Sequence, residues 1–360
     1  MTVHSGAVDA SSAGWLASPN MERDSAFGVL IVGTGAIAEL HIAALRASDR
    51  AGLVGLVDTD PVRAAAASYA NGGVRSTTDL TEALAWPEVD GVIVCTPNGS
   101  HATIAHAVAA AGKHLLVEKP LATTTVDALA VLEDFRRAGR VLATAQTHRA
   151  YDYSLAVKSA LDSGRIGDPL VIRATLLGGW IWGDWRSWAI DPGASGGHSL
   201  HNGVHLLDLV CWWMGARPDS VYARGRKQTA GELEIYDYLE LVLRFPGNKI
   251  AQCEMSRAHR PGVISHRDVQ VIGTAGTLSL PWDAEPSLVL DEQGMSVLLP
   301  AGGNGFARQL TGWLDAIAGG DALASGEDGL AAVAMAEAAE LSIATGQPVP
   351  LTALAVEVVP

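Results

Sequence analysis

Histidines recur at the spacing of a helical turn in the segment 196–208. In a helix, His201, His205 and Asp208 would lie on one face, because residues three and four positions apart are neighbours there. An imidazole accepts a proton near neutral pH, so the pattern predicts a proton-transfer site with Asn202 beside it. Two histidines at this spacing are also typical of a zinc helix, but Asn202 stands where that pattern has its general-base glutamate. Histidines that only pack a helix are the third interpretation, and we expect no metal.

A lysine stands directly after a short apolar run. Residues 114–117 predict a buried strand, and Glu118, Lys119 and Pro120 follow it. Ligand sites of open α/β sheets collect at the carboxyl ends of the strands, so Lys119 is placed to bond a substrate oxygen. An exposed surface lysine is the alternative interpretation.

Tryptophans are concentrated in the segment 180–188, which holds four of the ten in the chain. An indole ring buries a large apolar area and keeps a polar N–H, so it suits a sugar, whose C–H patches lie well on aromatic faces. We expect a sugar-binding segment here, and an apolar contact with a second subunit is an alternative of equal weight. The candidate substrate contacts in this segment are Trp180, Trp182, Trp185 and Arg186.

A glycine-rich turn, GTGAIA at 33–38, lies between an apolar run and a helical stretch. One glycine permits a tight turn and the next lets the backbone approach a pyrophosphate at the helix N-terminus. Asp58 ends the next apolar run, at about the 20-residue offset of a carboxylate that bonds the ribose 2′-hydroxyl of NAD. It would repel the 2′-phosphate of NADP, so NAD is favoured, although Arg63 lies nearby. A turn without a ligand is the alternative. The predicted contacts of the turn are Gly33, Gly35, Ala36 and Ile37.

These residues require a particular arrangement of strands and helices. In residues 27–146, short apolar runs alternate with helical stretches, which predicts a parallel sheet covered by helices on both faces. Beyond it, longer runs alternate in polarity, as in an antiparallel sheet with one covered face. We expect an α/β fold with two domains. They are an N-terminal Rossmann doubly wound parallel sheet at 27–146 and a C-terminal α+β domain with an open, mostly antiparallel sheet at 147–360.

Composition and charge narrow the class of protein. The 360 residues are 48% hydrophobic, and a net charge of −14 argues against nucleic acid or an anionic membrane as a partner. No apolar run reaches the roughly 18 residues of a membrane helix. Three cysteines without a CxxC pair favour a reducing compartment, so we expect a cytoplasmic protein. Residues 1–26 do not have the pattern of a signal peptide, and we expect them to be a disordered leader.

The order of these motifs resembles the Gfo/Idh/MocA oxidoreductases, the glucose–fructose oxidoreductase and inositol dehydrogenase family. The landmarks between about Phe27 and Leu351 are GTGAIA at 33–38, Asp58, TPNGSH at 96–101, AGKHLLVEKP at 111–120, SGRIGDP at 163–169, GG…GVHLLD at 196–208 and GTAGTL at 273–278. The resemblance implies that Lys119 is the catalytic or substrate-binding lysine and that His205 is its partner in proton transfer. Many members carry an aspartate four residues before that histidine, where this chain has His201.

The same resemblance extends the expected sites. It implies a homodimer or homotetramer, because the open sheet of the family commonly serves oligomerisation. His201 becomes a candidate for substrate contact or proton relay in place of the missing aspartate. The further cofactor contacts that it implies are Thr96, Pro97, Asn98, His101, Glu118 and Lys119.

We therefore expect an NAD-dependent dehydrogenase that oxidises a secondary hydroxyl of a sugar, cyclitol, anhydrosugar or glycoside. Lys119 would hold the oxygen, His205 with His201 would take the proton, and Asn202 would help to orient the ring. Two alternatives remain open. One is a glycosidase or oxidoreductase that retains its NAD and releases no net NADH, and the other is a non-catalytic sugar or nucleotide sensor.

Overall fold

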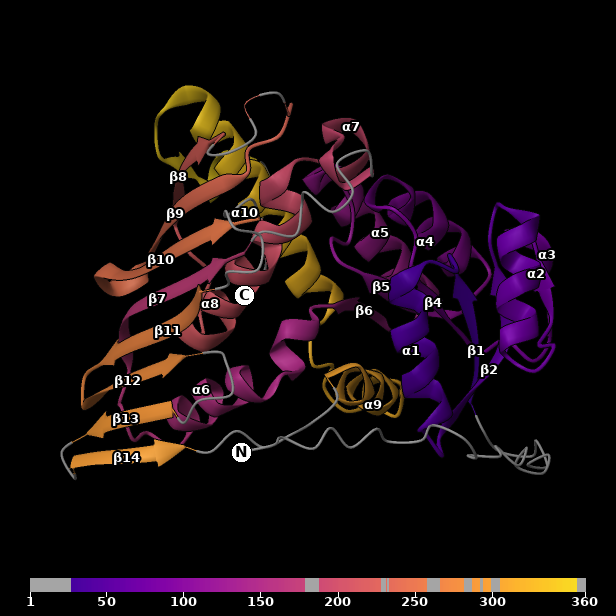
Figure 1. Ribbon diagram of the computed structural model, residues 1–360, viewed down its shortest axis with the longest axis horizontal. Helices are drawn as coiled ribbons and strands as arrows, with labels where there is room; N and C mark the ends of the chain where they lie inside the picture. Colours follow the sequence, from indigo (N-terminus) through magenta and orange to yellow (C-terminus); the bar gives the residue numbers. More distant parts are fainter. Residues whose placement is uncertain are drawn as a thin grey trace, which may run out of the picture.

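Two sheets and their helices make up the protein (Figure 1). The computed structural model describes residues 27–178, 188–227, 231, 233–257, 266–281, 287–291, 294–298 and 305–354. The expected leader at 1–26 lies outside these residues. None of the described helices is long and apolar enough to cross a membrane.

The N-terminal sheet has six parallel strands in the order β3-β2-β1-β4-β5-β6. Its strands are β1 (Phe27–Val32), β2 (Ala51–Val57), β3 (Ser76–Thr77), β4 (Gly91–Val94), β5 (His114–Glu118) and β6 (Leu142–Ala145). Its helices are α1 (Ala36–Arg46), α2 (Pro61–Ala70), α3 (Leu80–Leu84), α4 (His101–Ala110) and α5 (Thr125–Ala138). The strand order reverses between β1 and β4, and the loops that leave these strands form the crevice in which such sheets bind ligands.

Local sequence explains why these elements form. All four residues of β4 are buried, as expected of a strand with helices on both faces of its sheet. The Asp60 side chain caps α2 by accepting from two backbone N–H groups, and Pro61 occupies the first turn. Thr124 caps α5 by accepting from the backbone N–H of Asp127, and Gly139 ends that helix in the left-handed conformation.

The C-terminal sheet has nine strands in the order β14-β13-β12-β11-β7-β10-β9-β8-β15. Its pairs are antiparallel except that β7 and β10 run parallel. Its strands are β7 (Pro169–Leu177), β8 (Ser220–Arg226), β9 (Tyr238–Phe245), β10 (Lys249–Ser256), β11 (His266–Gly273), β12 (Gly276–Pro281), β13 (Ser287–Asp291), β14 (Gly294–Leu298) and β15 (Val349–Pro350). The helices of this part are α6 (Asp152–Asp162), α7 (Pro192–Ser195), α8 (Val204–Met214), α9 (Gly305–Ile317) and α10 (Gly326–Thr345).

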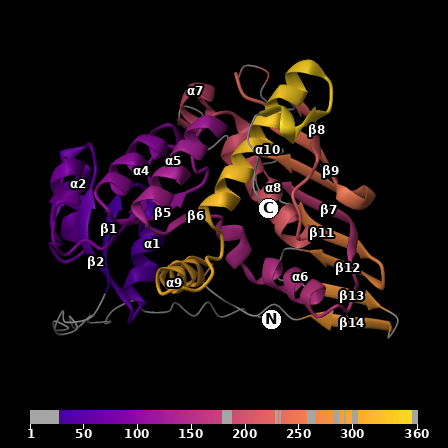
Figure 2. The same cartoon turned by 180° about the vertical axis from the view of Figure 1, so that it is seen from behind.

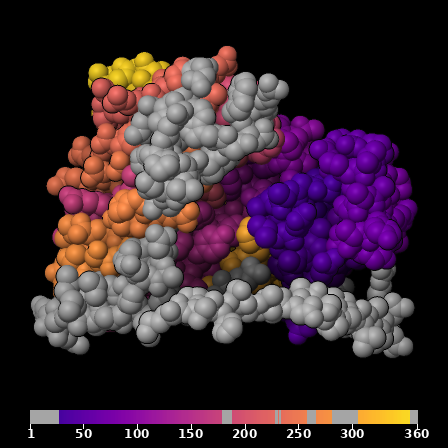
Figure 3. Space-filling model, viewed as in Figure 1, coloured from indigo at the N-terminus to yellow at the C-terminus, as the bar shows by residue number. Residues whose placement is uncertain are grey.

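Helices cover one face of this second sheet. In the view from behind, α6, α8 and α10 lie between the nine strands and the N-terminal sheet (Figure 2). The other face carries the exposed positions of strands that alternate between buried and exposed side chains, as β9 does. The space-filling view shows the indigo and purple surface of the N-terminal part beside the orange surface of the nine strands (Figure 3).

One helix of the C-terminal part returns to the N-terminal sheet. Helix α9 packs against α1, and its Trp313 is buried with its ring 5.7 Å from that of Phe27, edge to face. Phe306, on the same helix, lies edge to face on His41 of α1. The strands of the parallel sheet all precede the domain boundary predicted between residues 146 and 147, and those of the second sheet all follow it. Helix α9 comes after this boundary but packs against α1 of the N-terminal part.

The predicted fold class is confirmed: a parallel Rossmann sheet is followed by an open, mostly antiparallel sheet. The sequence reading did not anticipate the short elements β3, α3 and β15, or the hairpin of β13 and β14. The shared face of His201, His205 and Asp208 assumes a regular helix through the histidine segment. Instead, Ser199–Gly203 form a π-helix that leads directly into α8. Short elements carry too little periodicity to be predicted, and a π-turn carries none of its own.

Candidate active site

The glycine turn joins β1 to α1 at the carboxyl edge of the parallel sheet. Gly33 has a φ of 90°, and a Cβ at this position would lie 2.8 Å from the carbonyl oxygen of Cys95, so glycine is required. Gly35 is the N-cap of α1, without a side-chain cap and with open space where its Cβ would be. Ala36 and Ile37 begin the helix. The N–H groups of this first turn fit a pyrophosphate in that open space.

Asp58 follows β2, and its carboxylate accepts several hydrogen bonds near this turn. It accepts from the backbone N–H and the hydroxyl of Thr34, at 3.0 and 2.7 Å, and from the backbone N–H of Asp60 at 3.0 Å. The guanidinium of Arg63 donates to it at 2.9 Å. Burial by itself would raise the pKa of Asp58, but these hydrogen bonds outweigh it and lower the pKa to about 2. The side chain is therefore a firmly ionised acceptor where a ribose is expected.

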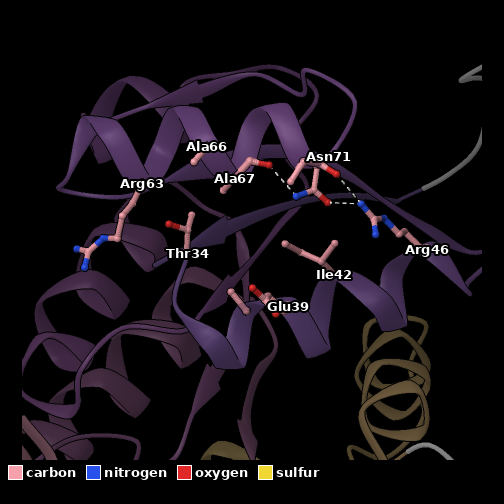
Figure 4. A pocket seen from close by; sticks show the side chains of 10 residues that line it. Thr34, Glu39, Ile42, Arg46, Arg63, Ala66, Ala67 and Asn71 are labelled. Carbon is pink, nitrogen blue, oxygen red and sulfur yellow. Dashed lines mark hydrogen bonds between the residues drawn. The ribbon is translucent and has the colours of Figure 1, made fainter. Parts of the chain in front are cut away.

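A pocket of about 450 Å³ opens beside this carboxylate, between α1 and α2. Figure 4 shows Thr34 and Arg63 toward one end of it and Arg46 with Asn71 toward the other. Arg46 donates to the side-chain oxygen of Asn71 at 2.7 Å, which joins the two helices. Two of the residues that bond to Asp58, Thr34 and Arg63, thus line an open space between α1 and α2.

Two predicted cofactor contacts hold the neighbouring loops together. The ring nitrogens of His101 lie 2.6 Å from the carbonyl oxygen of Pro120 and 2.8 Å from that of Thr96, so this buried imidazole links the loops after β4 and β5. Glu118 is bonded to His41 at 2.9 Å. Their contacts with the cofactor remain predictions. The predicted contacts in the loop after β4 are Thr96, Pro97, Asn98 and His101.

Lys119 leaves the end of β5 and points its ammonium at the histidine segment. Its Nζ donates to the backbone carbonyl oxygen of His201 at 2.7 Å. Burial lowers the pKa of Lys119 to about 8; Glu118 opposes this shift and Arg257 adds to it. A lysine with this pKa is charged at neutral pH and can lose its proton just above it.

His205 lies in the first turn of α8 and is buried. Its ring stands 4.2 Å from that of His148, centroid to centroid, and His148 is in turn bonded to the hydroxyl of Tyr153. Within the described residues, Nδ1 of His205 has no hydrogen-bond partner. Burial, then the charges of His148 and Lys119, hold the pKa of His205 well below its ordinary value. It is therefore a neutral imidazole that can accept a proton.

His201 lies one helical turn before His205, and its surroundings hold its ring in place. Its ring packs edge to face on Trp188 with centroids 5.0 Å apart. Its Nδ1 lies 3.4 Å from the side-chain nitrogen of Asn98, which also donates to the carbonyl oxygen of Ser195 at 2.7 Å. Burial and Lys119 hold the pKa of His201 well below its ordinary value. Loops of the parallel sheet and the histidine segment thus meet in one place.

Comparison with known proteins gives this arrangement a family. Residues 27–146 match the model described as oxidoreductase family, NAD-binding Rossmann fold, and residues 154–279 match the GFO/IDH/MocA C-terminal domain. The 1,5-anhydro-D-fructose reductase of Ensifer adhaerens is 31% identical over 88% of this chain and 96% of its own. The chain belongs to the Gfo/Idh/MocA family.

Two further relatives agree with this. The inositol 2-dehydrogenase of Rhizobium meliloti is 28% identical over 88% of this chain and 96% of its own. The crystal structure of GenD2 from gentamicin A biosynthesis, in complex with NAD, is 27% identical, covers 93% of this chain and 99% of its own, and has a TM-score of 0.78. This Gfo/Idh/MocA protein is an NAD-dependent oxidoreductase acting on CH–OH groups.

One cation near the histidine segment of this Gfo/Idh/MocA chain was not predicted from the sequence. Arg257 directly follows β10, and its Nη2 donates to the side-chain oxygen of Asn202 at 2.9 Å. Burial, with Arg267, lowers the pKa of Arg257 to about 10. Its position after a strand end, like that of His148 after β6, was the available signal, but an arginine after a strand is too common to stand out.

Asp208 serves a different purpose from the one its spacing suggested. Both of its carboxylate oxygens accept from Arg149 at 2.7 Å, and both side chains are buried. Arg149 also donates to Asp328 at 3.1 Å, which ties the loop after β6 to α8 and to the start of α10. Asp208 therefore helps to hold α8, the helix that carries His205, in its position.

The tryptophan segment is only partly described. Trp180, Trp182, Trp185 and Arg186 lie outside the described residues, so their predicted substrate contacts remain predictions. Trp188 is described and packs against His201. Among the residues that the structure does describe, no group of three or more His, Cys, Asp or Glu side chains is arranged to hold a metal ion. The three cysteines are buried free thiols.

Proposed function

We propose that this protein oxidises a secondary hydroxyl of a sugar, cyclitol, anhydrosugar or glycoside. The observation that carries the proposal is the hydrogen bond from the charged Lys119 to His201, one helical turn before the neutral, buried His205, beside the cofactor edge of the parallel sheet. The relatives named above for inositol and 1,5-anhydrofructose support a polyol as substrate.

The roles of the two residues follow from their protonation. The Lys119 ammonium has three donors, and the bond to the His201 carbonyl uses one. The others can hold the substrate oxygen and stabilise the negative charge that develops on it. His205 is neutral and accepts the hydroxyl proton through a ring nitrogen. Bound NAD would supply the acceptor for the hydride that leaves the carbon of the oxidised hydroxyl.

His201 and Asn202 are proposed as substrate-positioning residues. The ring of His201 is fixed by Trp188, and its carbonyl oxygen orients the Lys119 ammonium. Asn202 is buried and bonded to Arg257, so its amide is also held in one orientation. Rigid neighbours of this kind lower the cost of orienting a ring hydroxyl.

Formation of NADH with a panel of sugars, cyclitols, anhydrosugars and glycosides tests this function. Lys119→Ala and His205→Ala should each lower kcat/KM at least about 100-fold, as is typical when an acid–base or oxyanion-stabilising group is removed. Lys158→Ala and His106→Ala are the matched controls, since these side chains form surface ion pairs with Asp162 and Asp134. Full turnover by both active-site variants would disprove the assignment. NAD binding without NADH release from any substrate would favour retained-NAD chemistry or a sensor.

We also propose a cytoplasmic homodimer or homotetramer that associates through the outer face of the nine-stranded sheet. Ile250 of β10 is 40% exposed on that face, where it pairs with Val171 of the neighbouring strand β7. Sedimentation velocity on the protein and on Ile250→Lys tests this, because a charge in an apolar contact disfavours association.

A further inference from the structure

A histidine that acts as a base is usually oriented by a hydrogen bond from its second ring nitrogen to a carboxylate or a carbonyl oxygen. Within the described part of the chain, His205 has no such bond, because its buried Nδ1 has no partner there. The carboxylate on the same helix, Asp208, accepts with both oxygens from Arg149. The residue one turn earlier is His201, whose neutral ring lies against Trp188. The orientation of the His205 ring therefore depends on packing.

The ring that packs on His205 is that of His148. The two centroids are 4.2 Å apart and the ring planes are inclined at 38°. His148 lies in the short 3-10 helix Thr147–Ala150, which follows β6. The next residue, Arg149, forms the buried ion pair with Asp208 of α8. The loop after β6 and helix α8 are therefore joined at two neighbouring points, one by the two rings and one by the ion pair.

The His148 ring is itself restricted by its other neighbours. Its Nδ1 is hydrogen-bonded to the hydroxyl of Tyr153 in the first turn of α6. The ring of Tyr151 contacts it edge to face, with centroids 5.4 Å apart. Tyr151 in turn lies close to α9, where a Cβ on Gly305 would be 2.6 Å from the Tyr151 ring. These contacts hold the His148 ring in place, so it presents a fixed surface to His205.

His148 also affects the protonation of His205. Burial has the largest effect and His148 the next, and both hold the pKa of His205 well below its ordinary value. The pKa of His148 is itself lowered to about 3, mainly by burial. Removal of the His148 ring would expose His205 to water and let its pKa rise toward the ordinary value of about 6.5. The other groups that lower the pKa of His205 are Lys119, Arg257 and His201.

We propose that His148 is a positioning residue of the reaction, which holds the His205 ring in the orientation in which it receives the hydroxyl proton. The inference rests on the proposed function and adds a residue to it. In this role His148 neither accepts nor donates a proton during the reaction. A misplacement of about 1 Å in a reacting group can lower a rate about 100-fold, so a ring that acts only by packing can have a large effect on turnover.

Substitutions that separate the ring of His148 from its hydrogen bond test this role. His148→Ala removes both and should lower kcat for oxidation about 10- to 100-fold, while KM for the substrate and for NAD changes by less than about 3-fold. His148→Phe keeps a flat ring without the bond to Tyr153 and should recover most of kcat. His148→Gln can keep the bond without the ring and should be as slow as His148→Ala.

The pH profile gives a second readout, which a loss of stability alone would not change. The wild-type protein should show no acid limb, because His205 is already neutral. In His148→Ala the pKa of His205 rises, so kcat/KM should fall as pH falls below about 6, where a protonated His205 cannot accept the hydroxyl proton. In His148→Phe an apolar ring still covers His205, so no acid limb should appear.

His114→Ala is the matched control for these variants. His114 also contacts an aromatic ring, that of Phe27, and accepts from the backbone N–H of Val141 at 3.1 Å. It is the first residue of β5, at the opposite end of the strand from Lys119. Its removal should leave kcat and the pH profile unchanged. Thermal melting and NAD binding show that each variant is folded.

Three results would overturn the inference. They are an unchanged kcat without an acid limb in folded His148→Ala, a rise in KM alone, which marks a substrate contact, and recovery of kcat by His148→Gln but not by His148→Phe. If His148→Ala does not fold, the comparison of His148→Phe with His148→Gln decides. Failure of the wild-type protein with every polyol removes the proposed function itself, whereas equal turnover by the wild-type protein and His148→Ala removes only the inference.

Discussion

Removal of the Asp58 carboxylate should change the cofactor preference of this enzyme. The carboxylate accepts from Thr34, from the Asp60 backbone and from Arg63, and its pKa is about 2. In Asp58→Ala, the 2′-hydroxyl of the NAD ribose loses a charged acceptor. The guanidinium of Arg63, which is 61% exposed, is released toward the position of a 2′-phosphate. The variant should therefore bind NAD less well and NADP better.

The expected size follows from these contacts. A hydrogen bond to a charged group contributes about 1.5–3 kcal/mol, so kcat/KM for NAD should fall about 10- to 100-fold. With the gain from an arginine–phosphate contact, the NAD-to-NADP ratio should fall about 100- to 1,000-fold. The lowered pKa of Asp58 also stabilises the fold by roughly 1–2 kcal/mol after allowance for the exposed Arg63. Because this pKa is depressed, the contribution is present above about pH 4 and is lost as pH falls toward about 2.

Steady-state kinetics with both cofactors at low salt provide the assay. Asp60→Asn is the control, because it keeps an oxygen at the cap of α2 and removes a charge near Arg63 without removing the ribose contact. The double variant Asp58→Ala/Arg63→Ala should lose the gain with NADP. If folded Asp58→Ala keeps the wild-type preference for NAD, or if the double variant still gains NADP, the argument for these two residues is refuted.

Five other outcomes follow from the site. The kcat/KM for oxidation should fall as pH rises through about 8, where Lys119 loses its proton, and a flat profile there would argue against the role of Lys119. No acid limb should appear near the ordinary histidine pKa, because His205 is already neutral. Gly33→Ala should cost about 1–3 kcal/mol in thermal unfolding and abolish NAD binding, since its Cβ would meet a carbonyl oxygen at 2.8 Å. Asp208→Asn should lower the free energy of unfolding in urea by about 3–5 kcal/mol, while turnover per folded molecule is largely kept. His201→Asp should move the alkaline limb above pH 8, because a carboxylate next to Lys119 stabilises its ammonium.

Much of the fold could be predicted from sequence because its strongest signals are local. The strand, glycine turn and helix at 27–46, the proline-led helix at Pro61 and the apolar run at 91–94 each follow from composition and periodicity. The parallel pairing of β7 with β10 could not be predicted this way, since strands far apart in sequence give no local sign of their register. The packing of α9 against the N-terminal part could not be predicted for the same reason, because it is a contact between segments far apart in the sequence.

The residues of the candidate site could be predicted from the sequence where they belong to a recognisable motif. Lys119, His201 and His205 stood out by type and position, and the structure brings them together with Asn98. The spacing of Asp208 suggested a third residue of that group, but the buried arginine that takes its carboxylate comes from another part of the chain. Partner choice of this kind depends on tertiary packing, which spacing along one helix does not encode.

His201 has a physical meaning in this setting that its sequence position alone does not give. An aspartate here would place a negative charge next to Lys119, stabilise the ammonium and raise its pKa. His201 is kept neutral by burial and by Lys119, so it fills the position without adding charge. The alkaline limb depends on this one charge, so His201→Asp should move it to higher pH. An unmoved limb in folded His201→Asp would show that the titrating group is not Lys119 beside residue 201.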